Sequence, residues 1–217
     1  MSHQHSHEVT PEMFEQPSWD ERYAGSGRVW SGRPNAVLVA EASRLAPGRA
    51  LDVGCGEGGD AIWLAEQGWE VTAIDFSEAG LARAAEHAAE RGVADRIEWR
   101  HADLRTWTAP AGEQWDLVTS CFLHLLGDGM LRATGEMAAA VAPGGTLLVA
   151  GHHPDDAHTG LRWSMPGVLF TADELAPAVD PDLFDVRAEA RSRTETRDGQ
   201  KHAVTDAVLV GHRRDAP

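Results

Sequence analysis

One short segment combines three closely spaced glycines with acidic residues, and it constrains the fold more than any other part of the chain. Residues 51–60 read Leu-Asp-Val-Gly-Cys-Gly-Glu-Gly-Gly-Asp. Glycines at 54, 56 and 58 let a strand turn sharply into a helix, because glycine adopts positive φ without strain and leaves room for a ligand beside the backbone. We therefore expect a strand, a turn and a helix, with a flat polar ligand at the turn.

The glycine spacing alone fits two ligands. Counted as 54, 56 and 59, the glycines also satisfy the dinucleotide fingerprint G-x-G-x-x-G. A pyrophosphate on the helix N-terminus is anionic, and Asp52 and Glu57 would place two negative charges beside it. S-adenosylmethionine has no phosphate and carries a sulfonium and an ammonium, so the same carboxylates attract it. The acidic turn therefore favours this methyl donor over NAD.

Two further acidic residues follow predicted strands. Asp75 lies 21 residues after Gly54 and ends the apolar run 70–74, and Asp103 follows the predicted strand 96–101. A carboxylate at a strand end can accept both hydroxyls of a ribose in a bidentate hydrogen bond. NAD and S-adenosylmethionine both contain a ribose, so Asp75 indicates a nucleoside without distinguishing the two.

These residues make the chain resemble the class I S-adenosylmethionine-dependent methyltransferases over roughly residues 19–213. The resemblance implies that Asp52 and the glycine turn hold the methionine end of the cofactor, and that Asp75 holds the ribose. It also implies that Asp103 bonds the adenine amino group and that Phe76 and Leu104 sandwich the adenine ring. S-adenosyl-L-homocysteine would be the product. The expected cofactor contacts are Trp30, Asp52, Gly54, Cys55, Gly56, Asp75, Phe76, Asp103, Leu104 and Ser120.

Strands and helices alternate along the first two thirds of the chain. This order predicts a doubly wound, seven-stranded, mostly parallel Rossmann-like sheet with right-handed crossovers and a ligand at the strand C-terminal ends. The predicted strands are 50–53, 70–74, 96–101, 116–120 and 146–150, and the predicted helices are 60–67, 77–91 and 131–141, the last ending at Pro143-Gly144-Gly145.

The order changes after the fifth strand. Thr171-Ala172-Asp173-Glu174 is a capping box that predicts a short helix. Asp198-Gly199 predicts a hairpin between strands 184–194 and 203–212. This C-terminal hairpin makes the seventh strand antiparallel, which is typical of class I methyltransferases and unusual in NAD-binding sheets.

Length and charge set limits on organisation and partners. We expect a histidine-containing disordered tail over residues 1–15 and a single domain over 16–217, with residues 16–47 as an N-terminal helical lid. The net charge of −15 disfavours nucleic acid and anionic membranes. Cys55 and Cys121 do not form a disulfide framework, and no apolar stretch reaches 18 residues, so we expect a cytoplasmic protein. The sequence gives no oligomeric state.

His124 is the first candidate for a general base. It follows the fourth predicted strand in Ser120-Cys121-Phe122-Leu123-His124, at the edge where the acceptor should lie. A base is needed only when the nucleophile arrives protonated, because the positive charge of the donor already activates its leaving group. An ordinary histidine that binds a backbone group is the alternative interpretation.

A second histidine cluster follows the fifth strand. His152, His153 and His158 lie close to Asp155 and Asp156 and offer acceptor-binding or metal-ligand groups, although their spacing matches no structural zinc motif. A polar surface loop is the alternative. The N-terminal histidines at 3, 5 and 7 could likewise chelate a metal, against a default of disorder.

Aromatic residues precede the first strand. Trp19, Tyr23 and Trp30, together with nearby arginines, suit a lid over a bound cofactor. In the alternative interpretation they plug the edge of the core.

Within the methyltransferases, the chain is most similar to the tellurite-resistance group, with thiopurine methyltransferases as looser relatives. The similarity lies in residues 19–23, Ser120 and the apolar residues after it, residues 170–175, and Arg193-Thr194. In that group a His-Arg pair is associated with the substrate side. Here Arg193 is preceded by Ser192, so the histidine is missing and tellurite is in doubt, while Arg193 could hold an anionic acceptor or be a surface cation.

The sequence therefore predicts methyl transfer to a small molecule: a chalcogen oxyanion, a thiol, or a phenol or quinol. Two alternatives remain open. One is a non-catalytic cofactor or metal sensor, indicated by the histidines. The other is an NAD(P)-dependent oxidoreductase, disfavoured by the acidic turn and the terminal hairpin.

Overall fold

The computed structural model describes residues 10–25, 27–158, 165, 167–197 and 199–215, leaving out the side chains of 158 and 197. Within them, seven strands form one sheet in the order β3-β2-β1-β4-β5-β7-β6. The strands are β1 (Arg49–Val53), β2 (Glu70–Asp75), β3 (Ile97–His101), β4 (Trp115–Cys121), β5 (Val141–His152), β6 (Phe184–Arg197) and β7 (Gln200–Arg213). The α-helices are α1 (Gln16–Ala24), α2 (Ala36–Ala42), α3 (Gly59–Glu66), α4 (Glu78–Glu90), α5 (Gly129–Ala139) and α6 (Ala172–Leu175). Short 3-10 helices are η1 (Pro11–Phe14), η2 (Ala94–Arg96), η3 (Pro154–His158) and η4 (Ala176–Ala178).

The strand directions confirm the predicted fold class. Strands β1 to β5 pair in parallel, whereas β7 runs antiparallel to both of its neighbours, β5 and β6. The chain proceeds from β1 outward to β3, then returns to the other side of β1 as β4. The strand order therefore reverses between β1 and β4, and the C-terminal ends of these strands form the switch point where doubly wound sheets bind ligands.

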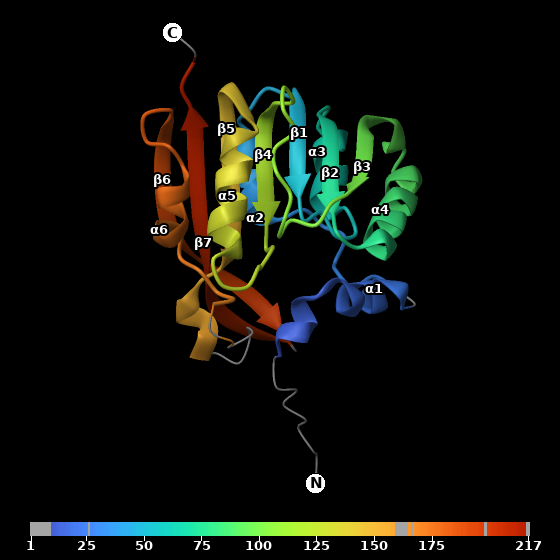
Figure 1. The fold of residues 1–217 in the computed structure, drawn as a ribbon. Coiled ribbons are helices and arrows are strands. Elements are labelled where there is room, and N and C mark those ends of the chain that lie inside the picture. Colours follow the sequence, from blue (N-terminus) through green and yellow to red (C-terminus); the bar gives the residue numbers. More distant parts are fainter. Residues whose placement is uncertain (1–9, 26, 159–164, 166, 198, 216–217) are drawn as a thin grey trace.

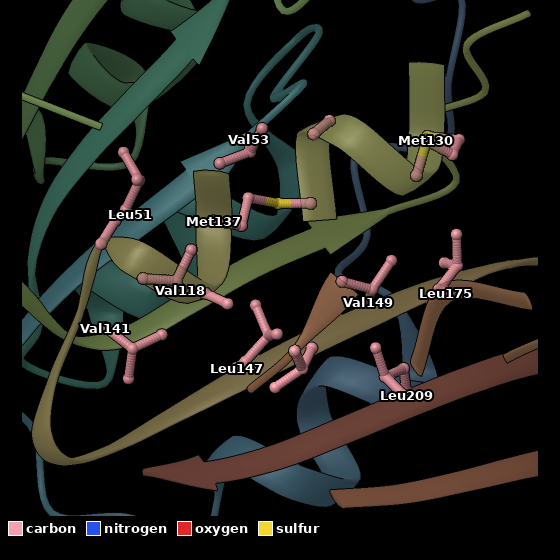
Figure 2. Close-up of a cluster of buried hydrophobic side chains, with 14 of the residues drawn as sticks. Leu51, Val53, Val118, Met130, Met137, Val141, Leu147, Val149, Leu175 and Leu209 are labelled. Carbon is pink, nitrogen blue, oxygen red and sulfur yellow. The ribbon is translucent and has the colours of Figure 1, made fainter. Parts of the chain in front are cut away.

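Helices cover both faces of the sheet, with α5 on one face and α2 and α3 on the other (Figure 1). On the α5 face, Leu51, Val53 and Val149 pack with Met130 and Met137 of that helix (Figure 2). On the opposite face, alternate residues of the same strands pack against α2 and α3. Because both faces are buried, the central strands are nearly continuous apolar runs.

The start of β5 differs from the prediction. The sequence predicted a strand at 146–150 after a Pro-Gly-Gly turn, but β5 begins at Val141, which pairs with Trp115 before the register shifts at Leu117. Gly145 makes this possible, because a Cβ there would lie 2.9 Å from the Ala142 carbonyl oxygen and 3.0 Å from that of Asp116. The Pro-Gly-Gly segment is thus an irregular stretch of a longer strand.

The structure confirms the helix caps and the hairpin that the sequence predicted. The Ser77 hydroxyl accepts a hydrogen bond from the Gly80 amide at the start of α4. Thr171 and Glu174 form the predicted capping box. The β6–β7 hairpin pairs Arg197 with Gln200, although Asp198 itself lies outside the described residues.

Structure begins earlier in the chain than expected. The boundary between tail and domain was placed at residue 16, but η1 starts at Pro11 and Phe14 is buried. The histidines at 3, 5 and 7 lie outside the described residues. No helix in the described part of the chain is long and apolar enough to cross a membrane.

Candidate functional site

The glycine turn joins β1 to α3 at the switch point. Gly54, Gly56 and Gly58 all have positive φ, at 78°, 51° and 80°. The amides of Gly54 and Cys55 both donate to the Ile74 carbonyl oxygen, at 2.9 and 3.1 Å. The turn is therefore tied to the end of β2 and has little freedom to move.

Protein side chains occupy part of the space that the glycines leave. A Cβ on Gly58 would lie 2.7 Å from the Trp99 ring, and one on Gly56 would lie 2.8 Å from the Tyr23 hydroxyl. From the sequence we expected a ligand in this space. At Gly58 the requirement for glycine comes from packing against β3, and at Gly56 it comes from the N-terminal segment.

Asp52 is a buried carboxylate at the end of β1. It is 2% exposed, and its Oδ2 has no hydrogen-bond donor in the described part of the chain. Burial raises the pKa of Asp52 well above its ordinary value, and the negative charges of Asp60 and Asp75 raise it further. An oxygen left this way at a ligand edge is suited to a donor or a cation arriving from outside.

Asp75 ends β2 and is bound by backbone. One carboxylate oxygen accepts from the Gly56 amide at 2.8 Å and the other from the Ser77 amide at 2.9 Å. Burial raises the pKa of Asp75, and these hydrogen bonds oppose the shift. Each carboxylate oxygen has a second lone pair, so Asp75 keeps acceptor capacity for a diol.

Asp60 was not singled out from the sequence. It is buried in the first turn of α3 and accepts from the backbone and side-chain amides of Asn35, at 2.7 and 2.8 Å. Burial raises the pKa of Asp60, and the bonds from Asn35 lower it. Asp60 fixes the start of α2 and adds negative charge beside Asp52. Its position directly after the glycines is the sequence feature that could have identified Asp60 as part of the site.

The predicted cofactor contacts near the ends of β2, β3 and β4 differ in their burial and in their hydrogen bonds. Phe76 is half-buried, and its carbonyl oxygen lies 2.8 Å from the His101 ring nitrogen Nε2. Asp103 is held by Arg105, which lowers the pKa of the carboxyl. Leu104 is packed in the α5-side core. The Ser120 hydroxyl is buried and donates to the Val53 carbonyl oxygen at 2.8 Å, which joins β4 to β1.

The N-terminal segment lies across the glycine turn. Helix α1 sits beyond the C-terminal ends of β1 and β2 (Figure 1). Its Asp20 accepts from the Ser77 hydroxyl at 2.5 Å, and the Tyr23 ring lies against Gly80. The Tyr23 hydroxyl accepts from the Trp30 indole nitrogen at 3.1 Å. Trp30 itself is 50% exposed, so it covers the turn from the solvent side.

Glu57 holds this segment in place. Its buried carboxylate accepts from the amides of Val29 and Trp30, both at 3.0 Å, and pairs with Arg83 at 2.9 Å. Burial raises the pKa of Glu57, but the bonds from Trp30, Arg83 and Val29 outweigh it and the net shift is downward. The sequence counted Glu57 as a charge that meets the ligand. The structure corrects this, because the carboxylate is committed to residues 29 and 30.

A second group of side chains lies at the ends of β4 and β5. The His124 ring stacks on His152, with centroids 5.1 Å apart, and packs against Phe170 at 5.5 Å. His152 also contacts Phe122 at 4.6 Å. The His124 Nδ1 lies 2.8 Å from the Val168 carbonyl oxygen. Since a carbonyl only accepts, Nδ1 carries the proton, and Nε2 of the neutral ring is an acceptor.

Backbone conformation supports this aromatic group. Phe122 has a φ of 62°, the only positive value at a non-glycine position in the described residues. Such strain in a bulky residue is characteristic of functional sites. Gly151 leaves room for Phe170, whose ring would lie 2.3 Å from a Cβ at that position.

Arg193 is paired with carboxylates. Its Nε donates to Asp206 at 2.6 Å and its Nη1 to Glu195 at 3.2 Å. Burial lowers the pKa of Arg193, but the carboxylates of Asp206 and Glu195 outweigh it and the net shift is upward. Asp206 pairs with His152 in the β5–β7 register, which brings Arg193 to the aromatic group.

His153 is bound within its own loop. Its Nδ1 accepts from the Asp155 amide at 3.2 Å, while Asp156 accepts from the Thr205 amide and anchors the loop to β7. The side chain of His158 lies outside the described residues. In the part of the chain that is described, no three His, Cys, Asp or Glu residues are grouped to hold a metal.

A cavity of about 250 Å³ borders the aromatic group. It shares Val168 and Phe170 with the surroundings of His124, and Asp128 and Glu174 lie at its wall. The other lining residues are Leu125, Gly127, Met130, Leu131, Gly167, Leu169 and Leu175.

Residues 50–145 match the family described as "Methyltransferase domain". A trans-aconitate 2-methyltransferase from Streptomyces avermitilis is 33% identical over 153 residues, covering 67% of this chain and 56% of the relative. A ubiquinone biosynthesis O-methyltransferase from Caulobacter is 36% identical over 154 residues, covering 64% and 60%. The chain thus spans little more than half the length of these curated relatives.

Solved structures share the fold. TehB from Haemophilus influenzae superposes with a TM-score of 0.67 at 19% identity, covering 92% of this chain and 67% of that one. The N-methyltransferase NodS from Bradyrhizobium japonicum, in complex with S-adenosyl-L-homocysteine, has a TM-score of 0.67 at 20% identity, covering 93% and 98%. At these identities the likeness establishes the fold.

Asp52 should lower stability at neutral pH. Its pKa is raised in the folded protein above the ordinary value of 3.8, so the folded state retains a proton that the unfolded state has lost. Stability must therefore fall as pH rises above that value. Asp52→Asn cannot ionise, and we expect it to raise the melting temperature at pH 7–8, with the gain shrinking toward pH 4.

Asp60→Asn is the matched control. The pKa of Asp60 is raised as well, but its second oxygen accepts from the Asn35 side-chain amide, so an amide NH₂ there would meet another donor and the variant should gain less than Asp52→Asn. Thermal unfolding of both variants across pH 4–8 checks the prediction, and an Asp52→Asn protein less stable than wild type at pH 7 would contradict it.

Proposed function

We propose that the chain is a class I S-adenosylmethionine-dependent methyltransferase and that it transfers the methyl group of S-adenosylmethionine to a small-molecule acceptor. The observation that carries the proposal is the acidic glycine turn at the switch point, where Asp52 presents a buried oxygen without a donor. The name of the trans-aconitate 2-methyltransferase gives a small molecule as the acceptor of that relative, which supports this acceptor size.

The residues at the turn fit the charges of the cofactor. Asp52, with Asp60 and Asp75 behind it, gives the site a negative potential that favours the ammonium and sulfonium of S-adenosylmethionine and opposes a pyrophosphate. The backbone of Gly54, Cys55 and Gly56 would line the methionine end. This arrangement supports the methyl donor over NAD.

The nucleoside end would be held by strand-end residues. Asp75 keeps lone pairs for the ribose, and Asp103 follows β3 at the place proposed for the adenine amino group. Phe76 would pack against the base. The Leu104 side chain lies in the core, so only its backbone would be available to the adenine ring. Ser120 would support the site by joining β4 to β1.

The cofactor brings a methyl carbon on a positively charged sulfur, so positioning and exclusion of water supply most of the rate. The stacked rings of His124 and His152 would orient the acceptor beside the strand ends. His124 would take the acceptor proton on Nε2, since its Nδ1 is fixed on Val168. Arg193 and His153, also predicted at the acceptor side, are committed to carboxylates and to the loop backbone, and we propose for them a supporting role.

We further propose that residues 16–47 form the lid of a single domain. Trp30 and Tyr23 cover Gly56, and Glu57 ties their segment to the glycine turn itself. A lid held in this way excludes water from the transferred methyl group.

Release of S-adenosylhomocysteine from S-adenosylmethionine, measured over a panel of small acceptors, tests the function. Asp75→Ala should weaken S-adenosylhomocysteine binding at least about 100-fold, because a hydrogen bond to a charged group contributes roughly 1.5–3 kcal/mol and the ribose would lose two. Glu78→Ala, an exposed neighbour at the start of α4, is the control and should bind as wild type. Titration calorimetry decides, and unchanged affinity in Asp75→Ala refutes the assignment.

His124→Gln should reduce kcat about 100-fold if His124 is the general base. Since a base must be unprotonated, wild-type kcat should rise with pH to a plateau, and the variant should lose this rise. His202→Gln, on β7 near the hairpin, should leave both rate and profile unchanged. A His124→Gln enzyme with wild-type kcat and pH profile limits the residue to packing.

Glu57→Gln should loosen the lid. Gln keeps the size but loses the charge that binds Arg83 and two backbone amides, so amide hydrogen exchange over residues 27–35 should speed up and cofactor affinity should fall about 10-fold. The control is Glu90→Gln, whose exposed pair with Arg28 at 3.8 Å contributes little. Equal exchange in the Glu57→Gln and Glu90→Gln proteins would show that Glu57 does not hold the lid.

A further inference from the structure

Asp206 is a buried carboxylate beside the acceptor side chains. It is 1% exposed, and its Oδ2 accepts from Arg193 at 2.6 Å. Its Oδ1 is buried and has no hydrogen-bond donor in the described part of the chain. A buried charged oxygen without a donor is costly, so a donor from outside the chain is favoured there.

The charges around Asp206 disfavour binding of an anionic acceptor by Arg193. This guanidinium donates to two carboxylates, Asp206 and Glu195, so the three groups together carry one negative charge. Asp128 and Glu174 add negative charge at the wall of the neighbouring cavity. An oxyanion or carboxylate acceptor would be repelled, contrary to the anion-binding role considered for Arg193 from the sequence.

The shape of the region suits a flat apolar molecule. The Arg193 guanidinium lies 5.9 Å from the Phe122 ring, which begins a continuous row of rings. The row runs from Phe122 through His152 and His124 to Phe170. The adjoining cavity of about 250 Å³ is lined by seven apolar side chains, two glycines and the carboxylates of Asp128 and Glu174. Apolar cavities of about 150 Å³ bind benzene, so this one has room for a substituted ring.

We infer that the acceptor is an uncharged aromatic molecule bearing a hydroxyl or amino group, and that Asp206 Oδ1 accepts the hydrogen bond from that group. The inference rests on the proposed function and names its acceptor class. Asp206 acts in binding and selects for a donor. Arg193 fixes the carboxylate so that Oδ2 is occupied and Oδ1 is left for the acceptor.

The test uses the full chain loaded with S-adenosylhomocysteine and measures binding by titration calorimetry. The ligands are catechol, aniline, 1,2-dimethoxybenzene, benzoate, selenite and tellurite. Catechol or aniline should bind at least 10-fold more tightly than the dimethoxy ether, which has the ring but no donor. Whichever of the two binds more tightly identifies the group as O–H or N–H, and the three anions should bind most weakly.

Asp206→Asn should reverse the preference. Arg193 would still donate to the side-chain oxygen, so the amide NH₂ would occupy the place of Oδ1. That NH₂ cannot accept a hydrogen bond from the hydroxyl or amino group of the ligand. Catechol or aniline should then lose at least 10-fold in affinity while the dimethoxy ether does not. Glu195→Gln removes the other partner of Arg193 but leaves Asp206 in place, so catechol or aniline should still bind more tightly than the dimethoxy ether.

The ligand series on the wild-type protein decides even if the Asp206→Asn protein does not fold. Binding of the ether as tight as that of catechol and aniline would overturn the inference. So would tighter binding of any of the three anions, or no binding of the aromatic donors. If wild type fails to bind S-adenosylhomocysteine, the proposed function fails first and the acceptor class falls with it.

Discussion

Three buried carboxylates meet at the C-terminal ends of β1 and β2, and the surrounding structure is arranged to tolerate them. Asp75 is bound by the amides of Gly56 and Ser77, and Asp60 by Asn35. Asp52 is left with a buried oxygen that no described residue satisfies. Burial of like charges is unfavourable, so a cation or a hydrogen-bond donor beside Asp52 would stabilise this corner of the fold.

The same glycine turn connects the proposed cofactor site to the N-terminal segment that covers it. Glu57 lies between Gly56 and Gly58 in sequence, yet its carboxylate binds the backbone at residues 29 and 30. The turn would therefore form the floor of the proposed site through its backbone, and it holds the proposed lid through this one side chain. Loss of either contact should affect binding without disturbing the sheet, because the core on both faces is formed by other residues.

The sequence predicted the sheet and the strand, turn and helix around the glycines well because their signals are local. Apolar runs, the glycine turn and the Thr171 capping box each depend on a few neighbouring residues. The extended β5 was missed because it depends on Gly145 fitting against the backbone of Asp116, which belongs to another strand. Asp206 and Arg193 meet only through the β6–β7 register, and Glu57 finds its amides 27 and 28 residues upstream. Such contacts follow from the topology of the sheet, and no local sequence pattern predicts them.

The central claim is that buried negative charge at the glycine turn selects a cationic methyl donor. Titration calorimetry of the wild-type chain with S-adenosylmethionine and with NAD, repeated on Asp52→Asn, tests it most directly. The account predicts saturable binding of S-adenosylmethionine, no binding of NAD, and at least a 10-fold weaker affinity for S-adenosylmethionine in the variant, since a hydrogen bond to a charged group contributes roughly 1.5–3 kcal/mol. NAD binding as tight as that of S-adenosylmethionine, or an Asp52→Asn protein with wild-type affinity, would contradict it.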